Sequence, residues 1–300
     1  MPASVLDLQG VLSSEKTRSG MQSSYSLQTS AGTTVASGVT AQMIRQIIIE
    51  QSKRAGVGHI GSGLCVADIL AALYGGVMHI ASPADPDRDR FVLSKGHAAL
   101  ALYAGLHLRG WISAEELNSF CGNGTFLGVH PEHGLKGVDF STGSLGQGLS
   151  FATGAALAAR LQHSCRRVFV LLSDAELNEG SVWEAIMFAG HHRLSNLVAV
   201  IDMNGQQAFG FTKDVINLPR IKETWSAFGW NVSSVDGHNV QEIADTIKGL
   251  DTAAGAPHVL FANTTFGKGV SFMEGQIKWH YSPLSDSEYR TAMMEVGKTK

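Results

Sequence analysis

Residues 168–206 read VFVLLSDAELNEGSVWEAIMFAGHHRLSNLVAVIDMNGQ. Two apolar runs, 168–172 and 197–201, predict strands, and the segment from about 178 to 192 between them predicts a helix. Asp174 follows the first run and Asn204 follows the second. Because parallel strands end at the same edge of a sheet, these two oxygen-bearing side chains can converge there. Mg²⁺ prefers such oxygens and often shares them with a phosphate, so the stretch predicts a metal–phosphate site. The alternative is that both residues serve ordinary turns between strand and helix, where Asp and Asn are common.

The chain on either side of this stretch alternates predicted helices with apolar strands. This alternation predicts an α/β fold with a parallel sheet flanked by helices. Residues 1–38 are rich in Ser, Thr and Gly and lack periodicity, so we expect a mobile N-terminal extension followed by one domain over 39–300. Further helices are expected over 40–54, 65–78, from the turn at 94–97 to about 108, 113–120, 145–161, 239–250 and 284–297, and further strands over 90–93, 230–235 and 257–264.

The composition of the chain excludes several classes of protein. The net charge of −3 gives no reason to expect nucleic acid or an anionic membrane as a partner. No apolar run approaches the roughly 20 residues needed to span a bilayer. The three cysteines, Cys65, Cys121 and Cys165, are odd in number and lack metal-type spacing. They are typical of reduced thiols, so we expect a cytoplasmic enzyme.

Several short motifs contain glycine, histidine or aromatic residues, and three of them lie ahead of predicted helices. Glycines let backbone amides approach a ligand, and a helix N-terminus favours an anion. For His97 the alternative role is a helix cap. His191 and His192 close a predicted helix, where a cationic end suits the helix dipole, so we assign them a structural role. The motifs are GHIGSG at 58–63, SKGHA at 94–98, HPEH at 130–133, STGSLGQG at 141–148 and WHY at 279–281.

The order of these motifs resembles that of the transketolases, enzymes that depend on thiamine diphosphate. The segments GHIG, DRFVLSKGHAALALYAGLHLRGW, HPE, STGSLGQGLS, SDAELNEG…MNG and WHYSPL carry a resemblance to the N-terminal, diphosphate-binding half, over about residues 40–300. It implies the cofactor thiamine diphosphate with Mg²⁺, for which Ca²⁺ or Mn²⁺ can substitute. In the family an Asn follows the metal-binding Asp by some thirty residues, and here 204 − 174 = 30. The resemblance thus implies Asp174, Asn204 and the backbone carbonyl of Gln206 as metal ligands.

The resemblance also implies roles for the remaining motif residues. His59, His130 and His280 are expected to be catalytic, holding sugar hydroxyls or relaying protons, since an imidazole titrates near neutral pH. The implied cofactor-binding set is His97, Gly143, Ser144, Leu145, Asp174, Ala175, Glu179, Asn204 and His280.

Two departures from the family pattern affect these expectations. Ser173 and Ala175 replace the two glycines that flank the metal-binding Asp in the family. If either position required a left-handed backbone, the cost would be roughly 1 kcal/mol or more, and cofactor affinity would be weakened. The second departure is that the chain stops near the start of the family's linker to a pyrimidine-binding domain, which carries the glutamate that activates the cofactor.

We therefore expect the diphosphate-binding subunit of a split transketolase, which transfers a two-carbon ketol unit from a ketose or its phosphate to an aldose or its phosphate. The expected partner is a C-terminal subunit with the pyrimidine-binding domain, in a heterotetramer or dimer of heterodimers. Two alternatives stay open. One is another thiamine diphosphate enzyme, such as a synthase that joins pyruvate to a sugar phosphate. The other is a degenerate, non-catalytic binding subunit.

Overall fold

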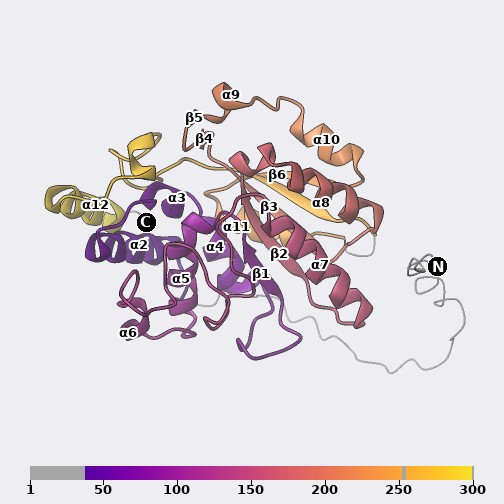
Figure 1. Ribbon diagram of the computed structural model, residues 1–300, viewed down its shortest axis with the longest axis horizontal. Helices are drawn as coiled ribbons and strands as arrows, with labels where there is room; N and C mark the ends of the chain where they lie inside the picture. The colour runs from indigo at the N-terminus through magenta and orange to yellow at the C-terminus, as the bar shows by residue number, and fades with distance from the viewer. Residues whose placement is uncertain (1–37, 252–254, 299–300) are drawn as a thin grey trace, which may run out of the picture. The chain divides into compact units, whose positions relative to one another are not determined.

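The computed structural model describes residues 38–251 and 255–298. In these residues a five-stranded parallel sheet has the strand order β1-β2-β3-β7-β6 (Figure 1). The predicted α/β architecture is confirmed, and each predicted strand is found within two residues of its expected ends. The strands are β1 (Arg90–Leu93), β2 (Val168–Ser173), β3 (Leu197–Met203), β6 (Asn231–Asp236) and β7 (His258–Asn263).

Helices cover both faces of the sheet and bury alternate side chains of each central strand. In β2, Phe169 and Leu171 pack into one core, whereas Val168, Val170 and Leu172 pack into the other. Burial on both faces explains why β2 reads as a continuous apolar run. The first core contains side chains of α2 (Ala41–Ala55), α3 (Ile60–Leu64), α4 (Ala67–Ala72), α5 (Ala99–Leu108), α11 (Val240–Lys248) and α12 (Asp286–Lys298), and the second those of α7 (Gly148–Leu161), α8 (Gly180–His191) and α10 (Ile221–Ala227).

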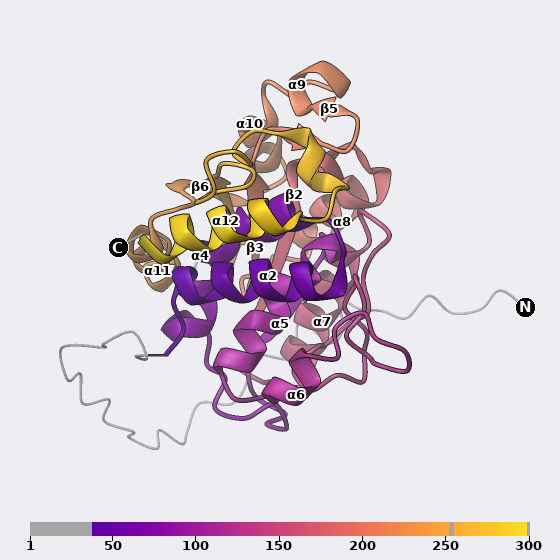
Figure 2. The same cartoon turned by 90° about the vertical axis from the view of Figure 1, so that its left-hand side faces the viewer.

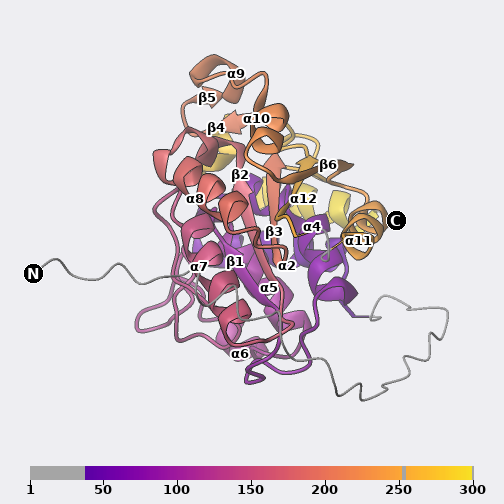
Figure 3. The same ribbon diagram turned by 90° about the vertical axis from the view of Figure 1, so that its right-hand side faces the viewer.

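The two ends of the domain lie together on the first face. Figure 2 shows α12 alongside α2, and the two helices pack against each other. The predicted capping box that starts α12 is present, because Ser285 N donates to Glu288 Oε2 at 2.9 Å and Glu288 N donates to Ser285 Oγ at 3.3 Å. Figure 3 shows α7 and α8 side by side on the opposite face.

Three predicted helices differ from the observed ones. The helix expected over 65–78 is observed as α4 and a π-helical turn, η2 (Leu73–Val77), in which Gly76 adopts φ 154°, and α3 precedes it. The helix expected from 145 begins at Gly148, because Gly146 adopts φ 86° just before it. The helix expected from 178 begins at Gly180, after a 3₁₀ turn, η4 (Asp174–Asn178). Inside 65–78 the apolar pattern continues through the break, whereas the other two helices begin after glycine or polar residues, at 146–147 and 178–179. The short helix expected over 113–120 is observed as α6 (Ala114–Leu117), with its predicted capping box between Ser113 and Glu116.

The segment between β3 and β6 contains elements that the sequence pattern did not predict. A small hairpin, β4 (Gln206–Gln207) and β5 (Gly210–Phe211), is followed by α9 (Thr212–Val215) and α10. These elements are too short to have a readable periodicity.

One helical stretch, Ile60–Val77, is long and apolar enough to cross a membrane, but 94% of it is buried inside the protein. We therefore interpret it as core helix. The predicted N-terminal extension over 1–38 lies, apart from Gly38, outside the described residues.

Candidate active site at the carboxyl edge of the sheet

Asp174 lies at the carboxyl end of β2 and is only 1% exposed. Its Oδ2 accepts hydrogen bonds from Gly205 N and Thr212 Oγ1, both at 2.9 Å. Its Oδ1 is buried and has no partner. Burial, and then the nearby Asp202 carboxylate, raise the pKa of Asp174 to about 6. An ionised carboxylate is destabilised when one of its oxygens is buried without a hydrogen-bond partner, and a bound cation would stabilise it.

Asn204 is brought to Asp174 by the loop that begins the β4–β5 hairpin. The hydrogen bond from Gly205 N to Asp174 closes this loop over the end of β2. The Asn204 Oδ1 accepts from Gln206 N at 2.9 Å, which leaves a second lone pair on the amide oxygen. The predicted convergence of the two strand ends is therefore observed, while their role as metal ligands stays a prediction.

Within residues 38–251 and 255–298, no group of three His, Cys, Asp or Glu side chains forms a metal-binding cluster. The predicted set is of another kind, since it combines one carboxylate, one amide and one backbone carbonyl. Such oxygen ligands suit a hard cation that keeps part of its coordination for a phosphate.

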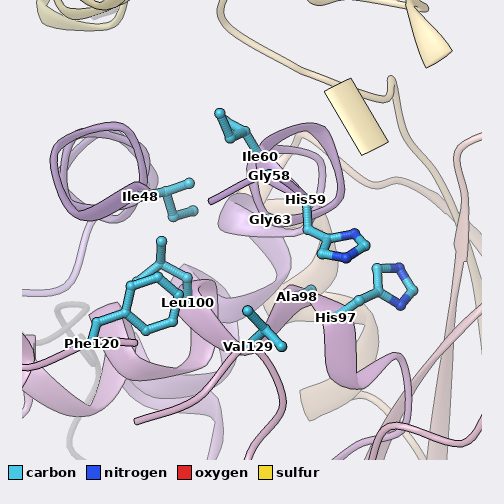
Figure 4. A pocket seen from close by; sticks show the side chains of 10 residues that line it. All are labelled: Ile48, Gly58, His59, Ile60, Gly63, His97, Ala98, Leu100, Phe120 and Val129. Carbon is cyan, nitrogen blue, oxygen red and sulfur yellow. The ribbon is translucent and has the colours of Figure 1, made fainter. Parts of the chain in front are cut away.

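Four histidines gather at the same edge of the sheet, where His97 follows the carboxyl end of β1. The ring centroids of His59 and His97 are 5.6 Å apart, and those of His97 and His280 are 6.4 Å apart. Figure 4 shows the His59 and His97 rings next to each other in a pocket whose other wall is apolar, with Ile48 and Phe120. His130 joins them from the irregular loop after α6, where a Cβ on Gly143 would lie 3.1 Å from its ring.

Burial favours the neutral imidazole at His59, His97 and His280. Burial, followed by the Lys95 ammonium, lowers the pKa of His97 well below its usual range. Burial is also the main cause that lowers the pKa of His280 to about 4, and it lowers the pKa of His59. The Nδ1 of His59 and the Nε2 of His280 are buried without a protein partner. Each can therefore exchange a hydrogen bond with a ligand.

Two glycine-containing turns approach each other at the same edge. A Cβ on Gly96 would lie 2.8 Å from Gly143 N, so only glycine permits this contact. Thr142 Oγ1 donates to Leu93 O at 2.6 Å, which anchors the second turn to the end of β1. Ser144, beyond this anchor, is exposed and Leu145 is half-buried. The turns that carry His97, Gly143, Ser144 and Leu145 thus lie together, and their predicted role in binding the cofactor stays a prediction.

The sequence matches a known family over residues 37–299, the transketolase thiamine diphosphate binding domain. The chain belongs to the transketolase family. It is 41% identical over 261 residues to the 6-deoxy-6-sulfo-D-fructose transketolase subunit SqwG of a Clostridium species, covering 86% of this chain and 95% of the relative. It is 39% identical over 256 residues to an apulose-4-phosphate transketolase subunit of Phocaeicola vulgatus, covering 85% of this chain and 91% of the relative.

Longer transketolases match over part of their length. The crystal structure of transketolase from Campylobacter jejuni superposes with a TM-score of 0.81 at 32% identity, covering 87% of this chain and 42% of the crystallised chain. The chain therefore spans less than half the length of that enzyme. These matches confirm the predicted thiamine diphosphate-binding fold and the prediction of a transketolase subunit.

The two positions where the transketolase pattern has glycine are accommodated without backbone strain. Ser173 has φ −91° and ψ 159°, and Ala175 does not have a positive φ. Ser173 instead forms a capping box, in which its N donates to Glu176 Oε2 at 2.9 Å and its hydroxyl to the same oxygen at 3.3 Å. The left-handed conformation that would have cost free energy is not required at either position.

Glu176 connects the loops that meet at this edge. It is fully buried, and its Oε1 accepts from Ser94 Oγ and, at 2.9 Å, from Gly146 N. Burial raises the pKa of Glu176. Glu179, one turn further, is exposed, and its Cβ lies close to Gly146. Glu176 therefore fixes the β1 turn, the glycine turn and the β2 end relative to one another.

Sequence reasoning missed three buried residues behind the candidate metal ligands. The Lys95 ammonium contacts Asp202 Oδ2 at 2.5 Å, and both side chains are fully buried. Cys65 Sγ lies 3.1 Å from the same oxygen. Although burial acts to raise it, the Lys95 ammonium holds the pKa of Asp202 below its ordinary value. The sequence did contain a signal, because Asp202 is the only charged residue in an otherwise apolar strand, and a buried charge requires a partner.

Proposed function

We propose that this chain is the diphosphate-binding subunit of a Mg²⁺-dependent transketolase that moves a two-carbon ketol unit from a ketose, or its phosphate, to an aldose, or its phosphate. The observation that carries the proposal is the meeting of Asp174, with its unpaired buried oxygen, and the Asn204 loop at the edge of the sheet where the histidines also gather. The two bacterial relatives, named for 6-deoxy-6-sulfo-D-fructose and for apulose-4-phosphate, support a ketose donor with an anionic end.

In this proposal Asp174, Asn204 and the backbone carbonyl of Gln206 hold Mg²⁺, and Ca²⁺ or Mn²⁺ can take its place. The donor chemistry supports the fit, because the Asp174 Oδ1 has no partner and the raised pKa of this carboxyl is one that an adjacent cation would lower.

When bound, thiamine diphosphate supplies the nucleophilic carbon and the electron sink for carbon–carbon bond cleavage, and the chain supplies binding, orientation and electrostatics. His97 and the turn at 143–145 line the cofactor. His59, His130 and His280 face the sugar, where their ring nitrogens can exchange hydrogen bonds with hydroxyl groups. The unpartnered Nδ1 of His59 and Nε2 of His280 support this role.

The partner is a C-terminal subunit with the pyrimidine-binding domain, and it contacts the hairpin at the rim of the site. Phe209 is 88% exposed there, and Phe211 is 51% exposed. Tyr281, which follows His280, donates its hydroxyl to Ala208 O at 2.7 Å and adds a third exposed ring. Exposed apolar groups clustered at the rim of a site are typical of protein–protein contacts.

A second apolar surface supports self-association into a dimer of heterodimers. Four large side chains of α7 and α8 are 40–47% exposed: Phe151, Leu161, Met187 and Phe188. A hollow of about 300 Å³ lies between these two helices. We place the enzyme in the cytoplasm, in sugar metabolism of the pentose phosphate type, and the three free cysteines support a reducing compartment.

The decisive experiment is an activity assay of the purified chain with Mg²⁺ and thiamine diphosphate, with and without a partner chain encoded beside it. Phosphorylated, sulfonated and free ketoses are offered as donors with an aldose acceptor. We expect activity only with both chains and a product longer than the acceptor by two carbons. No activity with any neighbouring pyrimidine-domain chain would contradict the proposal.

Two further measurements separate the alternatives, namely the assay with pyruvate added and a calorimetric titration. A synthase that joins pyruvate to a sugar phosphate would require pyruvate and release carbon dioxide. A degenerate binding subunit would show no heat of binding when the two-chain complex is titrated with Mg²⁺ and thiamine diphosphate.

A further inference from the structure

The buried ion pair between Lys95 and Asp202 has no evident purpose in the stability of the fold. Both side chains are fully buried between the candidate metal ligands and the core. Removing two charges from water costs several kcal/mol for each ion, and such a pair is often no more stable than apolar residues of the same volume. Asp202 lies two residues before Asn204, and Lys95 lies two residues before His97. Because the pair lies next to these site residues, we expect its role to be in the site.

The hydrogen bonds of Asp202 supply that reason. Its Oδ2 accepts from Asn204 Nδ2 at 2.8 Å, in addition to the Lys95 ammonium and the Cys65 thiol. Its Oδ1 accepts from Thr264 Oγ1. An ionised carboxylate can only accept hydrogen bonds, so the Asn204 amide must turn its nitrogen toward Asp202. Its oxygen then faces the opposite way, where it accepts from Gln206 N at 2.9 Å.

We propose that Asp202 is a positioning residue of the metal site, whose carboxylate fixes the Asn204 amide with its oxygen turned toward the cation. Lys95 supplies the counter-charge that allows an ionised carboxylate to be buried at this point. Without Asp202 the amide can rotate by half a turn and present its NH₂ group, which cannot bind a cation. This inference rests on the proposed function, because it presumes that Asn204 is a metal ligand.

Replacing a carboxylate that orients a metal ligand through a hydrogen bond typically lowers metal affinity by about 10- to 100-fold. We expect a fall of that size in Mn²⁺ affinity for the Asp202→Leu variant, which has no acceptor for the Asn204 amide. Because this change leaves the Lys95 ammonium buried without its partner, the variant can fail to fold. The double variant Lys95→Met/Asp202→Leu removes both charges and the hydrogen-bond acceptor, so it tests the proposal even if the single variant does not fold.

The measurement is the dissociation constant for Mn²⁺, followed by the electron spin resonance signal of free Mn²⁺, in the complex of this chain with its partner and saturating thiamine diphosphate. Melting temperatures without metal are recorded for every variant. The matched control is Thr264→Val, which removes the hydrogen bond to the other oxygen of Asp202 and leaves the Asn204 contact in place. We expect the control to bind Mn²⁺ within a factor of about two of the wild type.

The outcomes separate a positioning role from a structural one. Weaker Mn²⁺ binding in the double variant, with the control unchanged, supports the proposal. A double variant that binds Mn²⁺ like the wild type overturns it, whether or not its melting temperature is lower. If the wild-type complex bound no Mn²⁺, the proposed metal site would fail and this inference with it, and that result is distinct from the previous one.

Discussion

Replacing Asp174 by asparagine is expected to stabilise the chain in the absence of metal while it abolishes metal binding. The isosteric amide can still accept through its oxygen from Gly205 N and Thr212 Oγ1, which now bond Asp174 Oδ2. The substitution also removes the negative charge of Asp174, which burial and the Asp202 carboxylate destabilise. The variant therefore loses a group that suits a bound cation and gains a neutral group that is more stable in the buried position when no cation is bound.

The magnitude follows from the raised pKa of Asp174. The pKa rises from 3.8 to about 6, so the protonated carboxyl is favoured more strongly in the folded chain than in the unfolded chain. At 1.36 kcal/mol for each pH unit, ionisation costs the fold about 3 kcal/mol, present in full above pH 6 and absent below pH 4. For a domain of this size that corresponds to roughly 5–10 °C in melting temperature.

The assay is thermal unfolding in EDTA at pH 8 and at pH 4, followed by circular dichroism. We expect Asp174→Asn to melt above the wild type at pH 8 and level with it at pH 4. In the presence of the partner, added Mg²⁺ and thiamine diphosphate should raise the melting temperature of the wild type but not that of the Asp174→Asn variant. Asp214→Asn, which makes the same change at an exposed position in α9, is the control and should alter neither quantity. A variant less stable than the wild type at pH 8 would refute the reasoning.

Three further predictions test other parts of the site. Gly96→Ala should destabilise the chain by about 1–3 kcal/mol in urea unfolding, because its Cβ would lie 2.8 Å from Gly143 N, whereas Gly180→Ala, with nothing within 4 Å, should not. His280, whose pKa burial lowers to about 4, should stay neutral, so its NMR resonances should not titrate between pH 5.5 and pH 8; a midpoint near pH 6.5 would contradict this. Ser173→Gly should not improve cofactor affinity by calorimetry, because Ser173 has an unstrained φ of −91°, and a gain of tenfold would show that its side chain does crowd the diphosphate.

The sheet was predictable because its signal is local. β2 and β3 are buried on both faces, and such strands read as apolar runs whatever their neighbours are. The hairpin that carries Gln206 and Phe211 was not predictable, since four paired residues have no period. Its position depends on the hydrogen bond from Gly205 N to Asp174, a residue 31 positions away in the chain.

The flank of Asp174 illustrates the limit of arguing from a family pattern. Two glycines replaced by Ser173 and Ala175 suggested backbone strain, yet neither residue adopts a positive φ. The sequence does contain the explanation, because Ser173 and Glu176 have the spacing of a capping box. Spacing alone could not distinguish a cap from a distorted phosphate loop.

The sequence by itself determined the α/β class, the two strand ends that carry Asp174 and Asn204, and the histidine motifs, because each depends on neighbours in the chain. Only the tertiary structure decided that Lys95 and Asp202 pair behind Asn204, since they are 107 residues apart and their contact depends on β1 and β3 lying on either side of β2. The sequence thus supplies the polar groups at this edge of the sheet, and the pairing of buried charges behind Asn204 follows from how the strands are ordered in the sheet.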